Sequence, residues 1–280
     1  MRLLVTGALG QLGTEVVAAF EGHDVIATDL PELDITDRDA VLSAVTALAP
    51  DAIVNCAAFT AVDDCEARPE LAFALNAMAV RYLVEAAARV GGQVCQISTD
   101  YVFDGEKAEP YHEWDATGPR SVYGSSKLAG EHELRPEDLL VRTSWLCSAN
   151  GPNMVATILR LAGEHDELRF VDDQRGHPSF APDVAAVIRR LIGDRRTGRY
   201  HVTNQGAGSW YEFARAVLAA SGADPDRVSP IATADLDPPR PAYRPANSVL
   251  DNRALRLAGL PVPPHYEEPL AALVGVLAGS

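Results

Sequence analysis

The sequence lacks the features that mark several large classes of protein. Its 280 residues include four cysteines, none of them in a C-x-x-C pair, so neither a disulfide framework nor a zinc knuckle is indicated. The seven histidines form no H-E-x-x-H motif, and no Gly-Lys pair is present to make a phosphate-binding P-loop. Metal-dependent hydrolysis and ATP hydrolysis are therefore disfavoured, and no metal site is predicted.

Positive charge and long apolar runs are also scarce. The 24 Lys and Arg residues against 39 Asp and Glu give a formal charge of −15, which disfavours nonspecific binding to nucleic acid or to an anionic membrane. Uninterrupted apolar runs fall short of the about 20 residues of a membrane span. The apolar run at the N-terminus ends at Thr6, too soon for a signal peptide. We expect a cytoplasmic protein with no nucleic-acid or membrane partner, and monomer and homodimer both stay open.

Hydrophobic periodicity predicts a doubly wound α/β fold. Short runs rich in Val, Ile and Leu alternate with longer Ala-rich segments of helical period. Because helical crossovers cover both faces, the sheet between them must be parallel and buried. The predicted strands are residues 2–6, 24–28, 52–56, 93–98 and 139–143, and the intervening helices begin near Gly10, Asp37, Pro69 and Ser121.

The pattern changes after Trp145. Helices are expected over 153–164, 182–192 and 209–220, with strands over 168–171 and 199–202. A Pro-rich passage at 225–245 is interpreted as an ordered, irregular wall, with a flexible linker as the alternative. We expect a Rossmann-like cofactor domain over 1–147, rejoined by about 168–204. The smaller substrate-binding part would comprise 148–167 and 205–280.

A glycine-rich loop follows the first predicted strand. The segment TGALGQLG at 6–13 places Gly7, Gly10 and Gly13 where the chain must turn, approach a pyrophosphate and pack a helix on the sheet. Gln11 and Leu12 lie at the start of that helix, whose amides and dipole favour an anion. The loop predicts a dinucleotide cofactor.

Residues after the second and third strands extend this prediction. Asp29 can accept hydrogen bonds from the adenine ribose and repel a 2′-phosphate, so NADH is favoured over NADPH; a turn cap is the alternative. Asp34 and Ile35 are expected to flank the adenine. Small residues after the third strand would let the cofactor lie against the backbone, and the predicted contacts there are Ala57, Ala58 and Phe59.

A catalytic group for ketone reduction is predicted in SVYGSSKLAGE. Tyr123 and Lys127 are four residues apart and share one face of a helix. A tyrosine hydroxyl can protonate a developing alkoxide when a neighbouring ammonium lowers its pKa from about 10. Thr99, at the end of the fourth strand, can hydrogen-bond the reacting oxygen. The alternatives are a solvated surface pair and a strand-end cap.

Together these motifs resemble the extended short-chain dehydrogenases/reductases, and among them the dTDP-4-dehydrorhamnose reductases. The matching segments are TGALGQLG at 6–13, NCAAFTAVDDCE at 55–66, STDYVFDG at 98–105, VYGSSKLAGE at 122–131, RTSWL at 142–146 and RPANSVLDN at 244–252. The resemblance implies reduction of the C4 ketone of a dTDP-4-keto-6-deoxyhexose, giving dTDP-L-rhamnose for polysaccharide synthesis. It implies Tyr123 as proton donor, Lys127 as its partner and Thr99 as the group that polarises the ketone.

The resemblance also implies substrate contacts in the second half of the chain. Asp100 and Trp145 would contact the nucleotide-sugar, and an aromatic after the fifth strand can cover the apolar methyl face of a 6-deoxy sugar. Asn153 and Arg244 would bind the thymidine diphosphate, since a guanidinium suits phosphate oxygens. A core tryptophan and loop-stabilising side chains are the alternatives.

Several residues depart from the family pattern and leave other functions open. Arg175, His177 and Ser179 stand in a stretch that is more usually small or apolar, and Phe59 replaces a more polar residue. A different dTDP-4-keto-6-deoxyhexose 4-reductase is the first alternative. A noncatalytic regulatory subunit resembling that of methionine adenosyltransferase is the second, and an epimerase or dehydratase is the third.

Overall fold

The computed structural model describes residues 1–278 and has at its centre a parallel sheet of six strands, in the order β10-β5-β4-β3-β1-β2. Since β3 returns to the opposite side of β1 from β2, the winding reverses between β1 and β3, where ligands of such sheets bind. The predicted α/β fold class is confirmed. The strands are β1 (Arg2–Thr6), β2 (Asp24–Thr28), β3 (Ala52–Asn55), β4 (Gln93–Thr99), β5 (Leu139–Thr143) and β10 (Gly198–His201).

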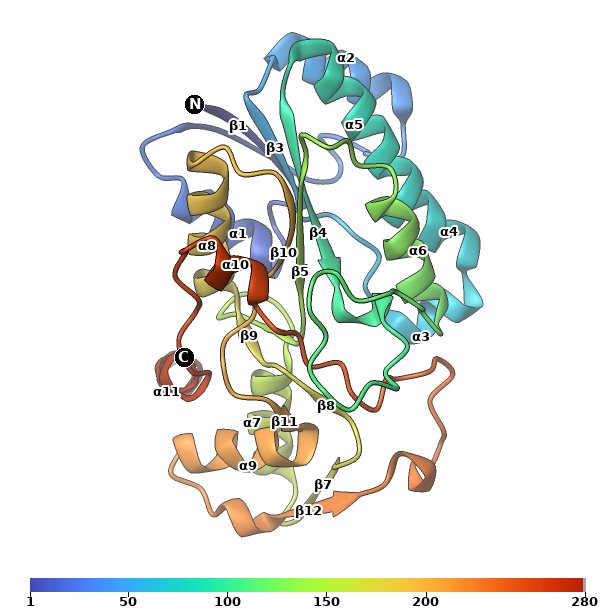
Figure 1. Ribbon diagram of the computed structural model, residues 1–280. Helices are drawn as coiled ribbons and strands as arrows, with labels where there is room; N and C mark the ends of the chain where they lie inside the picture. The colour runs from blue at the N-terminus through green and yellow to red at the C-terminus, as the bar shows by residue number, and fades with distance from the viewer. Residues whose placement is uncertain (279–280) are drawn as a thin grey trace.

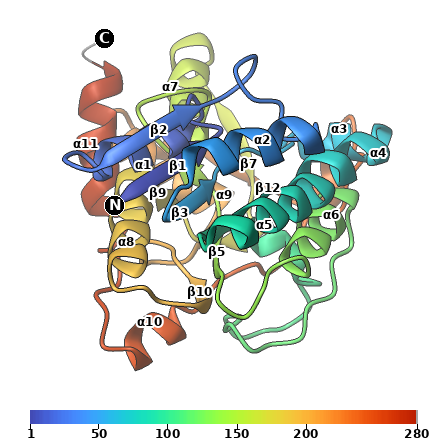
Figure 2. The ribbon, with the colours of Figure 1, turned by 90° about the horizontal axis from the view of Figure 1, so that it is seen from above.

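Helices cover both faces of this sheet (Figure 2). On one face lie α1 (Gln11–Ala19) and α8 (Ala181–Gly193), and on the other α2 (Arg38–Leu48) and α5 (Ala79–Val90). The side chains of β1 alternate accordingly: Leu3 and Val5 belong to the core under α1 and α8, and Leu4 to the core under α2 and α5.

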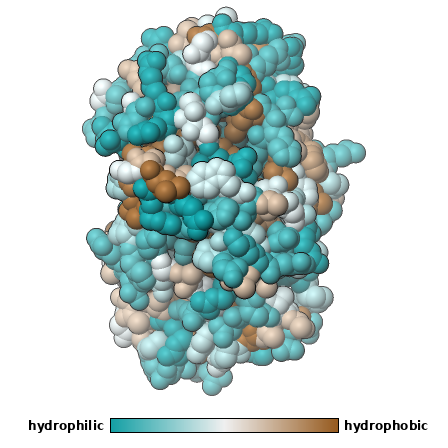
Figure 3. Space-filling model, in the orientation of Figure 1, coloured by the Kyte–Doolittle hydropathy of each residue, from teal (hydrophilic) through white to brown (hydrophobic). Residues whose placement is uncertain are grey.

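The helix that ends with α5 is unusually long. α4 (Pro69–Phe73), a π-helical turn η1 (Ala74–Met78) and α5 run without interruption over Pro69–Val90, 22 residues that are apolar enough to cross a membrane by length and composition alone. This differs from the sequence-based expectation, which considered only uninterrupted apolar runs. Half of its most apolar stretch is buried inside the protein, and the core helix of a globular protein can be equally long and apolar. Figure 3 shows a largely hydrophilic face with small, separated hydrophobic patches.

A second lobe lies beyond the carboxyl ends of the sheet strands (Figure 1). It contains α7 (Met154–Glu164), α9 (Trp210–Ala220), α11 (Glu267–Ala278) and a parallel pair formed by β7 (Leu168–Val171) and β12 (Val228–Ile231). Ile158, Phe213 and Leu270 belong to its own core. The shorter elements are α3 (Val62–Ala67), η2 (Asp100–Val102), α6 (Val122–Glu131), β6 (Leu146–Cys147), β8 (Arg175–Gly176), β9 (Ser179–Phe180), β11 (Gly208–Ser209), η3 (Pro225–Arg227), η4 (Thr233–Asp235) and α10 (Arg253–Leu257).

The chain returns to the central sheet later than the sequence suggested. Residues 168–171 form a strand as expected, but β7 pairs with β12 in the second lobe. The return begins at α8, whose Val184 and Ile188 join the core beside Leu3, and it ends with β10 next to β5. Strand sequence alone does not identify the partner strand, which explains the difference. The division into a cofactor part and a substrate part stays a prediction.

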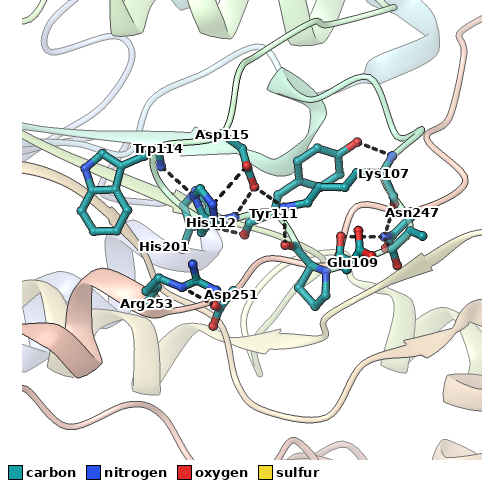
Figure 4. Close-up of polar contacts among 12 residues, drawn as sticks. Lys107, Glu109, Tyr111, His112, Trp114, Asp115, His201, Asn247, Asp251 and Arg253 are labelled. Carbon is teal, nitrogen blue, oxygen red and sulfur yellow. Dashed lines mark hydrogen bonds and ion pairs between the residues drawn. The ribbon is translucent and has the colours of Figure 1, made fainter.

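The loop that follows η2 lies against the segment at 244–252, one of those that carry the family resemblance, as Figure 4 shows. The loop after β4 and η2 contacts the segment before α10: the Tyr111 amide donates to the Val249 carbonyl at 2.8 Å, and the Asp251 amide donates to the Tyr111 carbonyl at 2.7 Å. The Asn247 side chain donates to the Lys107 carbonyl at 2.7 Å. This pairing anchors the loop that follows β4 and η2.

Candidate active site

A cleft of about 450 Å³ opens at the carboxyl ends of the central strands. It lies where the winding of the sheet reverses, as expected for a ligand site of this fold. Ten of the predicted site residues line it: Gly10, Gln11, Leu12, Gly13, Ala58, Thr99, Asp100, Tyr123, Lys127 and Trp145. Eight others lie outside its lining: Gly7, Asp29, Asp34, Ile35, Ala57, Phe59, Asn153 and Arg244.

The glycine-rich loop forms one wall, and close packing explains two of its glycines. Gly7 has a φ of +66°, and a Cβ atom there would lie 2.5 Å from the Ala57 amide nitrogen. A Cβ atom on Gly13 would lie 2.1 Å from the Gly7 carbonyl oxygen. The glycine-rich loop is therefore packed closely between the end of β3 and the start of α1. Ala57 contacts this loop but does not line the cleft.

Asp29 holds this loop from the end of β2. One carboxylate oxygen accepts a hydrogen bond from the Leu9 amide at 3.0 Å, and the other accepts from the Leu30 amide at 2.9 Å. The side chain is half-buried. The carboxylate thus acts as the turn cap that was one of its two predicted roles, and spare lone pairs remain for a ribose.

Asp34 and Ile35 occupy different environments. The exposed Asp34 carboxylate accepts hydrogen bonds from the Thr36 amide and hydroxyl, which hold its pKa below the ordinary value. Ile35 is buried in the core under α2 and α5. Their contact with adenine stays a prediction.

Three elements place the catalytic candidates together. Tyr123 and Lys127 project from α6, which starts at Ser121, whose hydroxyl accepts from the Gly124 amide at 3.1 Å. The Lys127 ammonium donates to the Ile97 carbonyl at 2.7 Å. The Thr99 hydroxyl, at the end of β4, donates to the Asp100 carboxylate at 2.9 Å and accepts from the Tyr101 amide. Thr99 therefore both caps η2 and faces the cleft.

Burial shapes the electrostatics of this group. Tyr123 and Lys127 are only 8% and 4% exposed. Burial raises the pKa of Tyr123 well above its ordinary value, so its hydroxyl keeps its proton. Burial lowers the pKa of Lys127 to about 8, an effect opposed by the negative charge of Glu131. Lys127 thus carries a positive charge near neutral pH.

Unpartnered polar atoms indicate that the cleft suits a polar ligand. Within residues 1–278, the buried side-chain atoms without a hydrogen-bond partner include Gln11 Oε1, Asp100 Oδ2 and Thr143 Oγ1, and all three residues line the cleft. Burial raises the pKa of Asp100 to about 6. Since buried polar groups are costly when unpaired, a ligand with donors and acceptors fits here.

Trp145 contributes an aromatic ring to the lining of the cleft. Its ring stacks on Trp210 with centroids 3.7 Å apart, and its backbone φ is +43°. A Cβ atom on Gly176 would lie 2.6 Å from the indole. The residue therefore packs on the second lobe, as the core-tryptophan alternative expects, and it also lines the cleft; its contact with the substrate stays a prediction.

Asn153 and Arg244 already have partners. Asn153 caps α7 by accepting from the Ala156 amide, and its amide group donates to the Ser148 carbonyl at 2.6 Å. Arg244 forms a bidentate ion pair with Asp63 of α3, at 2.6 and 2.8 Å. This ion pair fixes the Pro-rich passage to α3. The contact agrees with an ordered wall and not with a flexible linker.

The residues that depart from the family pattern lie outside the cleft lining. His177 is buried, its ring contacts the Thr203 hydroxyl at 3.0 Å, and burial lowers its pKa to about 4. Phe59 lies below the guanidinium of Arg68. Arg175 pairs with Glu212 at 3.2 Å, and Ser179 is fully buried. None of these residues therefore shapes the cleft wall directly.

The sequence-based reasoning missed several residues of the site. Tyr101 packs edge-to-face on Tyr123, with centroids 5.5 Å apart. The side chain of Asn76, in the π-helical turn, accepts a hydrogen bond from the Phe59 backbone amide and donates to the Phe59 carbonyl. It also donates to the Ser126 hydroxyl. A helical irregularity has no sequence pattern that could have located Asn76, whereas Tyr101 directly follows the Thr99–Asp100 pair. The other missed cleft residues are Cys56, Thr60, Val62, Ile97, Ser98, Thr143, Ser144 and Leu146.

No metal-binding group was found among the described residues. Over positions 1–278, no cluster of three or more His, Cys, Asp or Glu side chains could hold a metal ion.

Known proteins resemble this chain over its whole length. A family model described as the RmlD substrate binding domain matches residues 1–278. A dTDP-4-dehydrorhamnose reductase from Streptomyces griseus is 43% identical, over 99% of this chain and 94% of that protein.

Two solved structures of dTDP-4-dehydrorhamnose reductases are also similar to this chain. A dTDP-4-dehydrorhamnose reductase from Clostridium acetobutylicum has 42% identity and a TM-score of 0.96, covering 99% of this chain and 100% of that one. The enzyme of that name from Bacillus anthracis, solved in complex with NADP, has 37% identity and a TM-score of 0.93, covering 97% and 98%.

Proposed function

The chain belongs to the RmlD substrate-binding-domain family, and from this premise we propose that it reduces the C4 ketone of dTDP-4-dehydro-L-rhamnose to give dTDP-L-rhamnose. It is an NAD(P)H-dependent oxidoreductase of nucleotide-sugar biosynthesis. The observation that supports this most directly is the meeting of Thr99, Tyr123 and Lys127 in one cleft at the switch point of the sheet.

The cofactor end of the cleft is the glycine-rich loop. The amides at the start of α1 would hold the pyrophosphate, and Gly7 and Gly13 allow the backbone approach that this requires. Bound NADH or NADPH supplies the hydride. We propose a preference for NADH because the Asp29 carboxylate would repel a 2′-phosphate.

Proton transfer falls to Tyr123. Its buried hydroxyl is protonated before reaction and would donate to the developing C4 alkoxide. The Lys127 ammonium, fixed on the Ile97 carbonyl, would stabilise the phenolate that forms. The Thr99 hydroxyl would hydrogen-bond the ketone oxygen and aim it at Tyr123.

The substrate would occupy the side of the cleft that faces the second lobe. The unpartnered Asp100 oxygen suits a sugar hydroxyl, and the Trp145 ring suits the 6-methyl face. Contact of Asn153 or Arg244 with the diphosphate would require them to exchange their present partners, Ser148 and Asp63.

The experiment is NADH and NADPH consumption with enzymatically generated dTDP-4-dehydro-L-rhamnose, with the product identified by NMR. Formation of dTDP-L-rhamnose supports the proposal. Turnover only with a different dTDP-4-keto-6-deoxyhexose would favour the alternative reductase. Tight NADH binding without turnover on any such sugar would favour the regulatory-subunit reading. Monomer or homodimer, and a cytoplasmic location, stay predictions.

A further inference from the structure

A buried ion pair lies directly behind the catalytic helix. Glu131, the last residue of α6, and Arg142, in β5, have side chains that are 3% and 1% exposed. Arg142 Nε donates to Glu131 Oε1 at 2.8 Å, and Arg142 Nη2 donates to Glu131 Oε2 at 2.5 Å. Neither residue lines the cleft. Because a buried pair is no more stabilising than apolar residues of the same size, its presence calls for a different explanation.

The pair connects to the catalytic groups through β4. The Ser98 hydroxyl donates to Glu131 Oε1 at 2.6 Å. Ser98 lies between Ile97, whose carbonyl accepts the hydrogen bond from Lys127, and Thr99, whose hydroxyl faces the cleft. One carboxylate therefore ties the end of α6 to the short stretch of β4 that carries both contacts.

The pair also sets the charge around Lys127. Glu131 follows Lys127 by one helical turn, and its negative charge favours the ammonium, whereas burial disfavours it. Cys56, at the end of β3, is the other titratable group that acts on Lys127. Beyond the pair lie Arg199 and His201 of β10 and the buried Glu113.

We propose that Glu131, clamped by Arg142, is a positioning residue for the reduction: through Ser98 it fixes the Ile97–Thr99 backbone, and through its charge it keeps the Lys127 ammonium in place for proton transfer at Tyr123. This rests on the proposed reductase function. Glu131 does not line the cleft, so its effect passes through Lys127 and Thr99.

The test uses the fact that the sequence contains only two lysines, Lys107 and Lys127. In protein labelled with ¹³C at lysine Cε, the two signals are titrated by NMR. In Glu131→Gln, the Lys127 midpoint is expected to fall by about one pH unit, because a negative charge that favours the ammonium is lost. Lys107, paired with Asp115 at 2.6 Å, is the internal reference and is expected not to move.

Turnover is measured on the same variants. Glu131→Gln is expected to lower kcat about tenfold, with the NADH Kd and the sugar KM within twofold of the original values. Ser98→Ala is expected to lower kcat without moving the Lys127 midpoint, since it removes the link but no charge. Glu133→Gln is the matched control because Glu133 pairs on the surface with Arg81, and it is expected to change neither quantity.

The double variant Glu131→Gln/Arg142→Met guards against misfolding, because it leaves no unpaired buried guanidinium. It is expected to show the lowered kcat and a smaller fall in the Lys127 midpoint, because the positive charge of Arg142 is removed together with the negative charge of Glu131. An unchanged Lys127 midpoint in both Glu131 variants, or an unchanged kcat in Ser98→Ala, would overturn the proposal. The NMR titration needs no sugar, so failure of the unaltered protein to turn over the proposed substrate is a separate result.

Discussion

Replacement of Gly13 by alanine tests how closely α1 must approach the glycine-rich loop. A Cβ atom at position 13 would lie 2.1 Å from the Gly7 carbonyl oxygen and 2.8 Å from the Ala8 Cα. Such contacts are not observed below 3.0 Å, so the helix or the loop would have to move by about 1 Å. The obstructing atoms are backbone, which cannot rotate away as a side chain can.

The size of the effect follows from two opposing contributions. Overpacking of this kind costs about 1–3 kcal/mol, whereas alanine in a helix gains about 1 kcal/mol over glycine. The difference between them leads us to expect the free energy of unfolding to fall by up to about 2 kcal/mol. Displacement of the loop amides should also weaken NADH binding at least about tenfold, equivalent to about 1.4 kcal/mol.

The assays are urea unfolding and a fluorescence titration with NADH, with Gly163→Ala as the control. Gly163 lies within α7, where a Cβ atom would meet nothing within 4 Å. The same substitution there should therefore stabilise the protein by about 0.5–1 kcal/mol and leave NADH binding unchanged. If Gly13→Ala were as stable as Gly163→Ala and bound NADH normally, the close approach would not be required.

Three other predictions concern the reaction. Tyr123→Phe should lower kcat by about 10²–10⁴ while the NADH Kd stays within about twofold, and unchanged turnover would remove Tyr123 as proton donor. Asp29→Ala should narrow the ratio of kcat/KM values for NADH and NADPH; a constant ratio would argue against a ribose contact. Since the ammonium is the active form of Lys127 and its pKa is lowered to about 8, kcat/KM should fall above about pH 8, and a profile flat to about pH 10 would contradict this assignment.

The sequence located the local parts of the site because neighbours along the chain determine them. The spacing of Tyr123 and Lys127 placed them on one face of α6, and both line the cleft. The glycines at 7, 10 and 13 predicted a turn followed by a helix, and α1 begins at Gln11. The alternation of buried strands and helices predicted the parallel sheet, because each element is recognised from the spacing of apolar residues within its own segment.

Partners far apart in the sequence were decided only by tertiary packing. The strand at 168–171 was predicted, but its pairing with β12 depends on a segment about sixty residues later. The Asp63 contact with Arg244 likewise joins residues 181 positions apart. The Glu131 contact with Arg142 spans only 11 positions, but it too depends on how α6 packs beside β5.

The sequence by itself therefore determined the order of elements, the glycine-rich loop and the placing of Tyr123 and Lys127 on one helix face, because each follows from the backbone preference and side-chain periodicity of one short segment. The tertiary structure decided which strands meet, which charges are neutralised in the interior and which of the predicted residues face the cleft. Those outcomes depend on how whole elements pack. The local sequence around a carboxylate or within a strand does not indicate which partner it contacts in the folded protein.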